Sequence, residues 1–173
     1  MIRPAVAVLA LTVFAPGFAG LGLCARADPI PYVADDPATQ SAQDPRAVVA
    51  MLRRDGAVGR LTLDELDQPY FIGRIGKTRM VAAFFGCDEA LTLCRRVLYG
   101  ADLDLGGASE TQLADWSMAR QPCGAEASGP GRVWVWRSAR LYAQDDAAMA
   151  MAEKQAWLEC VADFRRLAGE GGP

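Results

Sequence analysis

The chain has 173 residues with 18 basic and 21 acidic side chains and no histidine. The lack of histidine removes the commonest general base, metal ligand and pH switch near neutrality. The net charge of −3 gives no electrostatic signature of binding to nucleic acid or to an anionic membrane surface.

The first 27 residues have the pattern of a secretory signal peptide. Arg3 precedes an uncharged apolar stretch over 5–23, and Ala25-Arg26-Ala27 supplies a small-residue cleavage site. We expect cleavage after Ala27, which leaves 146 of the 173 residues and takes the net charge from −3 to −5. That length suits one domain with its own core. An uncleaved membrane anchor and lipidation at Cys24 are the alternatives.

Residues 28–43 are rich in Pro, Asp and Ala and predict a flexible lead-in. Asp44 is then expected to cap a helix with Pro45 at its first position, and Gly56 ends it. Strand patterns follow over 61–63, 70–75, 80–85 and 97–105, with a hairpin turn at Gly76-Lys77. Both faces of 80–85 are apolar, which predicts a central strand covered on both sides.

A second helix is expected after Ser109, with Gln112 in the capping-box position and with Leu113 and Trp116 on its buried side. Residues 124–131 predict a turn-rich connection with at most a short strand near Cys123. The segment 132–142 alternates as a strand. A long helix is expected over 146–168, with a core stripe made of Trp157, Cys160, Val161, Phe164 and Leu167.

This order of elements predicts an α+β fold, an antiparallel sheet with N-terminal, middle and long C-terminal helices packed on it. The domain is expected to span 44–168, and 169–173 forms a frayed tail. No internal repeat or second domain is indicated.

Several motifs fall short of a site. Ile75-Gly76-Lys77-Thr78 resembles the end of a phosphate-binding loop, but Phe71 occupies the position of the first glycine. Asp102, Asp104 and Gly107 resemble a calcium loop, whose remaining ligand positions hold Gly106 and Leu113. Acidic groups at 64–67, 88–89 and 145–146 lie at turns or helix starts. We predict no catalytic, cofactor-binding or metal-binding residue.

Four cysteines remain after signal cleavage, and an exported protein favours disulfides over metal sites. Cys87 and Cys94 are not a C-x-x-C motif, and a disulfide between them would close the connection between two antiparallel strands. Cys123 and Cys160 then remain. We favour a second disulfide that ties the last helix to the sheet, and two buried free thiols are the alternative.

Trp134, Trp136 and Tyr142 share one side of the alternating segment 132–142 and form a candidate partner-binding face. The interpretation that we favour for the two tryptophans is the other one, in which they are core contacts of the terminal helix.

The stretch "LTLDELDQPYFIGRIGKTRMVAAFFGCDEALTLCRRVLYGADLD" and the ending "WLECVADFRRLAG" resemble the YbjN-domain family of bacterial sensory transduction regulators. The resemblance lies in the acidic-Pro-Tyr turn, Gly-Arg-x-x-Gly, Phe-x-Gly-Cys and the following cysteine, and it covers 44–168. Ser117 stands where the family has Asn after Trp, and 124–131 is altered. The resemblance implies a fold like the type III secretion chaperones and a regulatory, protein-binding role without catalysis.

We therefore expect an exported, periplasmic or secreted, non-enzymatic binding module of the bacterial envelope. The expected partner is another polypeptide, and homodimerisation is left open. No nucleic acid, no cofactor and no stable membrane insertion after signal cleavage are expected. A small envelope enzyme that uses carboxylate or cysteine chemistry is the alternative.

Overall fold

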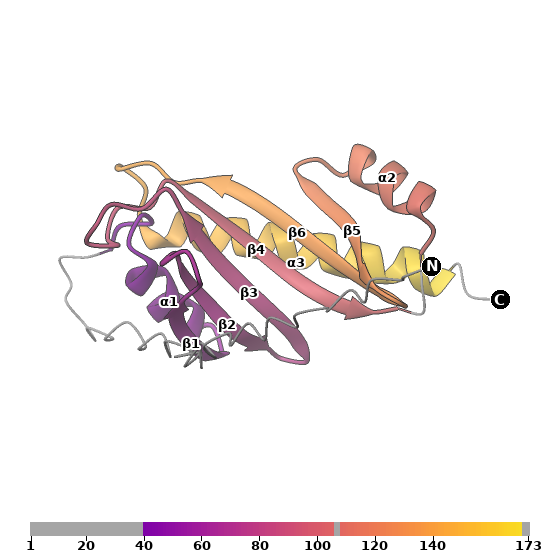
Figure 1. Ribbon diagram of the computed structural model, residues 1–173, viewed down its shortest axis with the longest axis horizontal. Coiled ribbons are helices and arrows are strands. Elements are labelled where there is room, and N and C mark those ends of the chain that lie inside the picture. Colours follow the sequence, from indigo (N-terminus) through magenta and orange to yellow (C-terminus); the bar gives the residue numbers. More distant parts are fainter. Residues whose placement is uncertain (1–39, 106–107, 171–173) are drawn as a thin grey trace, which may run out of the picture.

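Six strands form a single antiparallel sheet in the order β1-β2-β3-β4-β6-β5 (Figure 1). The computed structural model describes residues 40–105 and 108–170, so the expected signal peptide and most of the lead-in lie outside the described residues. The strands are β1 (Ala57–Leu63), β2 (Pro69–Ile75), β3 (Thr78–Phe85), β4 (Arg96–Asp104), β5 (Cys123–Gly129) and β6 (Arg132–Arg140).

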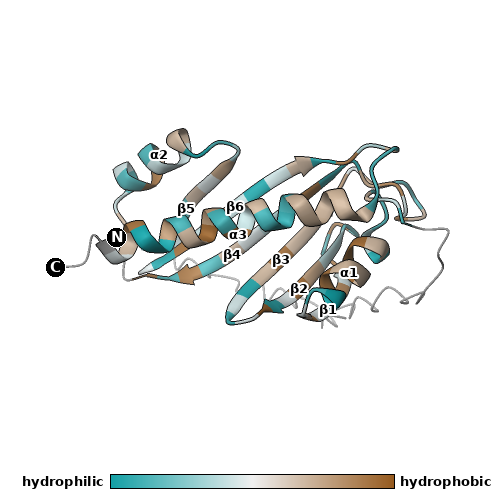
Figure 2. Ribbon diagram, turned by 180° about the vertical axis from the view of Figure 1, so that it is seen from behind, coloured by the Kyte–Doolittle hydropathy of each residue, from teal (hydrophilic) through white to brown (hydrophobic). Residues whose placement is uncertain are grey.

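Three helices accompany the sheet: α1 (Pro45–Arg54), α2 (Glu110–Ala119) and α3 (Ala147–Glu170). Figure 2 shows α3 lying lengthwise across the sheet with α1 beside it on the same face, and α2 lies beyond the β5 edge. The prediction of an α+β fold with an antiparallel sheet and a long C-terminal helix is confirmed.

The helix starts follow from local hydrogen bonding, as predicted. The Asp44 carboxylate accepts a 2.9 Å bond from the Arg46 N–H, and Pro45 needs no partner at the first helical position. At α2, the Gln112 N–H donates to the Ser109 hydroxyl and the Ser109 N–H donates to the Gln112 side chain. Both N-terminal caps are therefore fixed by side chains that the sequence identifies.

The core lies between the sheet and the helices α1 and α3. Tyr99 and Trp157 are fully buried, with ring centroids 6.2 Å apart. Each also satisfies its polar atom, because the Tyr99 hydroxyl donates to the Ala150 carbonyl at 2.8 Å and the Trp157 N–H donates to the Val135 carbonyl at 3.2 Å. These two bonds attach α3 to the centre of the sheet.

The β5 end of the sheet is held by α2 and by a disulfide. Trp116 packs edge-on against Phe164 of α3, with centroids 5.0 Å apart. Cys123, the first residue of β5, is bonded to Cys160 of α3, with the two Cα atoms 6.5 Å apart. α2, β5 and α3 therefore form one packed corner.

Some boundaries differ from the expectation. Residues 40–43 pack with the domain, because the Ala42 N–H donates to the Asp145 carbonyl and the Ala42 side chain is fully buried. Most of the expected turn-rich connection belongs to strand β5, which is paired with β6. At the other end, α3 continues to Glu170.

The prediction for residues 80–85 is wrong in one respect. β3 is central, but among the described residues only one of its faces is covered by helices. Met80, Ala82 and Phe84 are buried on that face, whereas Phe85 is 38% exposed and Val81 and Ala83 are half-buried. The apolar residues of the second face reach solvent.

Candidate binding face

The sheet surface opposite α1 and α3 is here called the open face, because no described helix covers it. Strand register assigns its residues: Ile72, Val81, Gly100 and Trp136 are successive cross-strand partners on β2, β3, β4 and β6. Directly paired residues in an antiparallel sheet project from the same face. The open face is therefore built from alternate residues of every strand.

Apolar side chains occupy the middle of the open face. Ile72 is 44% exposed, and the others of the group are half-buried although no described helix lies over them. We call this group the apolar band, and its members are Tyr70, Ile72, Val81, Ala83, Leu98 and Trp136. An exposed group of this kind on a sheet is typical of a binding surface.

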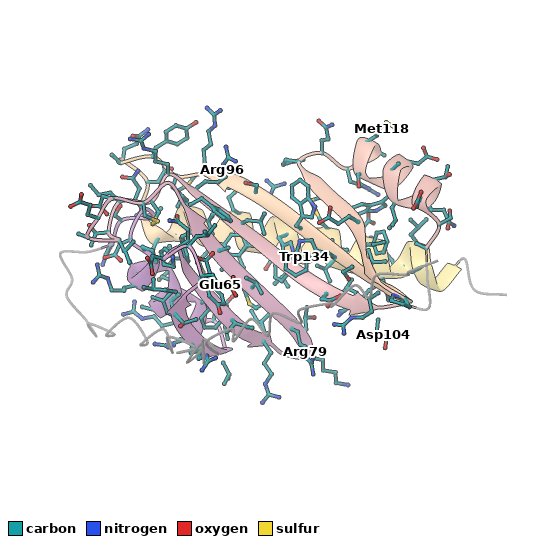
Figure 3. The ribbon with its side chains drawn as sticks, viewed as in Figure 1. Glu65, Arg79, Arg96, Asp104, Met118 and Trp134 are labelled. Atoms are coloured by element: carbon teal, nitrogen blue, oxygen red, sulfur yellow. A yellow bond between two sulfur atoms is a disulfide. The ribbon has the colours of Figure 1, made fainter. Side chains whose placement is uncertain are left out.

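Two tryptophans lie flat on the open face instead of standing out from it. A methyl group built on Gly100 would overlap the Trp134 ring, and one on Gly124 would overlap the Trp136 ring. Each indole therefore covers the backbone of a neighbouring strand at a glycine, and this gives both rings their partial burial. Figure 3 shows Trp134 in the middle of the sheet.

The interpretation of Trp134 and Trp136 as core contacts of the terminal helix is therefore wrong. Alternation along β6 was predicted correctly, but Val133 and Val135 are the residues that face α3, and both are buried. Alternation separates two faces and does not say which one the helix covers.

Tyr142 is not brought together with the tryptophans. β6 ends at Arg140, and Tyr142 belongs to the turn that leads to α3. Its N–H donates to the Asp145 carboxylate at 3.0 Å, and its carbonyl accepts from the Asp145 N–H. This turn takes Tyr142 out of the alternation, so the candidate face contains Trp134 and Trp136 without it.

Two arginine pairs border the apolar band, and sequence reasoning missed both. Arg74 is the direct cross-strand partner of Arg79, and Arg96 is the partner of Arg140. All four are exposed, and Figure 3 shows Arg79 and Arg96 at opposite ends of the sheet. Alternation combined with strand register would have placed them on one face, but register is not visible in a single sequence.

One acid of the open face, Asp102, lies on β4, next to the strand that carries Arg79. Asp102 accepts a 2.7 Å hydrogen bond from the Ser128 hydroxyl and pairs with Arg132. The Ser128 hydroxyl and the Arg132 guanidinium hold the pKa of Asp102 below its usual value against the opposing effect of desolvation, and Arg79 adds to this lowering. Asp102 is thus already engaged by its neighbours.

The four cysteines of the described chain form two disulfides, Cys87–Cys94 and Cys123–Cys160. The first closes the connection between β3 and β4, and its Cys94 N–H also donates to the Gln43 carbonyl at 2.9 Å. The second joins β5 to α3. Both pairings are those that the sequence favours, and they fit an oxidising environment.

The acidic groups considered as candidates in the sequence serve turns. The Asp64 carboxylate accepts from the N–H groups of Leu66 and Gln68, at 2.8 and 2.9 Å. Asp146 likewise accepts from the Ala148 N–H at the start of α3. Within 40–105 and 108–170, no three thiol or carboxylate side chains come together in the manner of a metal site, and no helix is both long and apolar enough to cross a bilayer.

Comparison of the chain with protein-family models, with curated proteins and with solved structures finds no match.

Proposed function

We propose that the chain is an exported, non-catalytic module that binds another polypeptide through the open face of its sheet. One observation carries the proposal: the apolar band and both tryptophan rings lie on a face that no described helix covers. Surfaces of this kind, apolar in the centre and polar at the border, are characteristic of protein interfaces.

The cellular setting of the proposal rests on covalent chemistry. Two disulfides in a small domain are stable outside the reducing cytosol, which supports a periplasmic or secreted location. The signal-peptide pattern of residues 1–27 supports the same location. The resemblance to the YbjN-domain family supports a chaperone-like or regulatory role in the bacterial envelope, and it is an analogy of sequence alone.

Site-specific photo-crosslinking tests the proposal. A benzophenone amino acid at Ile72 samples the open face, and the same residue at Gln155 samples the exposed side of α3. In cells that produce the protein, we expect polypeptide adducts from position 72 and none from position 155. The purified partner should then bind the mature protein, with Ile72→Asp weakening binding and Gln155→Asp leaving it unchanged.

The opposite pattern would contradict the proposal. Adducts from position 155 without adducts from 72 would place the interface on α3. A lack of adducts from 72, and also from Val81 and Leu98 on the adjacent strands, would show that the open face contacts no polypeptide.

A further inference from the structure

Resting on the proposed function, the geometry points to the class of the partner: a polypeptide segment with an apolar stripe bordered on both sides by carboxylates. We infer that this stripe covers the apolar band, while its carboxylates bind the arginine pairs Arg74–Arg79 and Arg96–Arg140. The inference adds a chemical identity to a surface whose occupant is otherwise undefined.

The first argument is that the four border arginines lack the carboxylate partners that several other arginines of the described chain have. Ion pairs with carboxylates engage Arg46, Arg120, Arg132, Arg137 and Arg166. Arg165 donates to the Thr78 hydroxyl instead, and Arg60 and Arg95 also form no ion pair with a described residue. None of the four arginines at the borders of the apolar band forms an ion pair with any described residue. Arg79 acts on Asp102 through space, but that carboxylate is bound to Ser128 and Arg132.

The second argument is that each border places like charges directly opposite each other. Arg74 lies across from Arg79, and Arg96 lies across from Arg140. Directly opposed like charges destabilise an antiparallel sheet. A carboxylate from a partner would remove this repulsion and would form charge-assisted hydrogen bonds with guanidinium groups. The arrangement is unfavourable in the free protein and favourable when an acidic segment is bound.

The third argument is distance. Arg79 and Phe85 lie six residues apart on β3, and Phe85 is the partner of Arg96, so the two arginine borders are about 20 Å apart along the strands. The space between the two borders is wider than an α-helix, whose diameter with side chains is about 10–12 Å. The rows of Tyr70 and Ile72 lie within that space. An amphipathic helix with acidic flanks therefore fits, in the manner of helix-in-groove recognition.

The shape of the apolar band favours a polypeptide over a nucleic acid or an anionic bilayer as the partner. A phosphate backbone would satisfy the arginines but would leave Ile72 and Val81 against a polyanion. A bilayer surface would need the largest apolar side chains of the face to project into it. Ile72 and Phe85 are exposed, but the two largest side chains, Trp134 and Trp136, lie flat over Gly100 and Gly124. The charge of the whole chain is also negative, which repels an anionic membrane from the remaining surface.

Binding of designed peptides to the mature, oxidised protein tests the inference. The probe is a labelled helical peptide of about 18 residues with a leucine stripe flanked by glutamates. Two matched peptides carry lysine in place of glutamate, or serine in place of leucine. Anionic phosphatidylglycerol vesicles and a single-stranded oligonucleotide serve as the other anionic probes.

The protein variants distinguish the effect of losing arginines on the open face from the effect of changing the net charge of the protein. Arg74→Gln with Arg79→Gln, and Arg96→Gln with Arg140→Gln, each remove one arginine border. The control, Arg120→Gln with Arg166→Gln, removes two charges from α2 and α3, where both arginines pair with Asp163. Urea unfolding of the border variants should show equal or greater stability, since like-charge repulsion is removed, so lost binding cannot be attributed to unfolding.

We expect the glutamate–leucine peptide to bind, with affinity that falls as salt is added. Each border variant should weaken it by at least about tenfold, and the control should change it by less than about twofold. Equal or tighter binding of the lysine or serine peptide would overturn the inference. Tighter binding of vesicles or oligonucleotide would overturn it as well, and would assign the face to that partner.

The outcome is distinct from that of the crosslinking experiment. If adducts form from Ile72 but the border variants bind the identified partner normally, the open face binds polypeptides and the acidic class is wrong. If no polypeptide is crosslinked from the open face, the proposed function itself is wrong.

Discussion

Gly100 and Gly124 explain how β6 can expose two tryptophans without leaving them to project into solvent. A glycine on the neighbouring strand leaves the space of a side chain, and the indole fills it. The alternation of residues 132–142 was visible in the sequence, but the glycine that each ring covers was not, because pairing brings together residues from β4, β5 and β6. The sequence thus places both tryptophans on the same face of the sheet but does not show that this face is the open one.

Gly100→Ala tests this arrangement. The added methyl group would overlap the Trp134 ring, so the ring must leave its position, and we expect a loss of about 1–3 kcal/mol in the free energy of unfolding. Gly129→Ala is the matched control, since a Cβ there meets nothing within 4 Å. Urea unfolding followed by tryptophan fluorescence measures both. Equal, small losses for the two variants would contradict the arrangement.

At the scale of elements, side-chain caps and apolar periodicity were sufficient for α1, α2 and α3. The helices carry their own signals in Asp44, Ser109 and the stripe around Trp157, although Leu167, predicted as its last member, is 37% exposed. In place of β5 only a short strand near Cys123 was expected, because Gly, Ser and Ala dominate its sequence and give little strand propensity. Its pairing with β6, and the Cys123–Cys160 bond, override that composition.

The connection between β3 and β4 gives a pH prediction. The Asp88 carboxylate accepts from the N–H groups of Leu93 and Thr92, at 3.0 and 2.7 Å. These bonds, with that of Leu93 the larger cause, hold the pKa of Asp88 below its ordinary value. A lowered pKa in the folded state stabilises the protein above the unfolded-state value of about 3.9, and this contribution is lost as pH falls through the folded-state pKa.

We therefore expect Asp88→Asn to lower the urea midpoint at pH 7 and to lower it progressively less below pH about 4. Glu89→Gln, which changes the adjacent exposed acid, should have no comparable effect at either pH. Midpoints measured across that pH range for both variants test the assignment. A difference for Asp88→Asn that is the same at pH 7 and in strong acid would contradict it.

At the scale of the whole molecule, the composition gives the net charge but does not show where on the surface the charged side chains lie. The net charge is negative, yet the open face carries two arginine pairs that form no ion pair with a described residue, and its Asp102 is already bound to Ser128 and Arg132. The fold class follows from the order of the elements. Which face of the sheet the described helices leave open depends on the strand order β4-β6-β5 and on the path of α3, and both are long-range features that a local pattern does not contain.

The two disulfides should contribute unequally to the stability of the whole domain. Cys87 and Cys94 are 7 positions apart, and Cys123 and Cys160 are 37 positions apart. By chain entropy, the short loop constrains the unfolded state by about 2.5 kcal/mol and the long loop by about 4 kcal/mol. The long one also ties the sheet edge to α3, so its removal frees β5 and α2 together.

Paired alanine variants, Cys87→Ala with Cys94→Ala and Cys123→Ala with Cys160→Ala, test this order by urea unfolding of the mature chain. Each pair contains one buried cysteine, Cys94 or Cys123, so the packing loss is similar and the difference reports the loop. We expect the second pair to lower the free energy of unfolding more than the first. The reverse order would mean that the Cys87–Cys94 disulfide stabilises the domain more than the Cys123–Cys160 disulfide does. The hydrogen bond from the Cys94 N–H to the Gln43 carbonyl, next to α1, would then be the reason to examine.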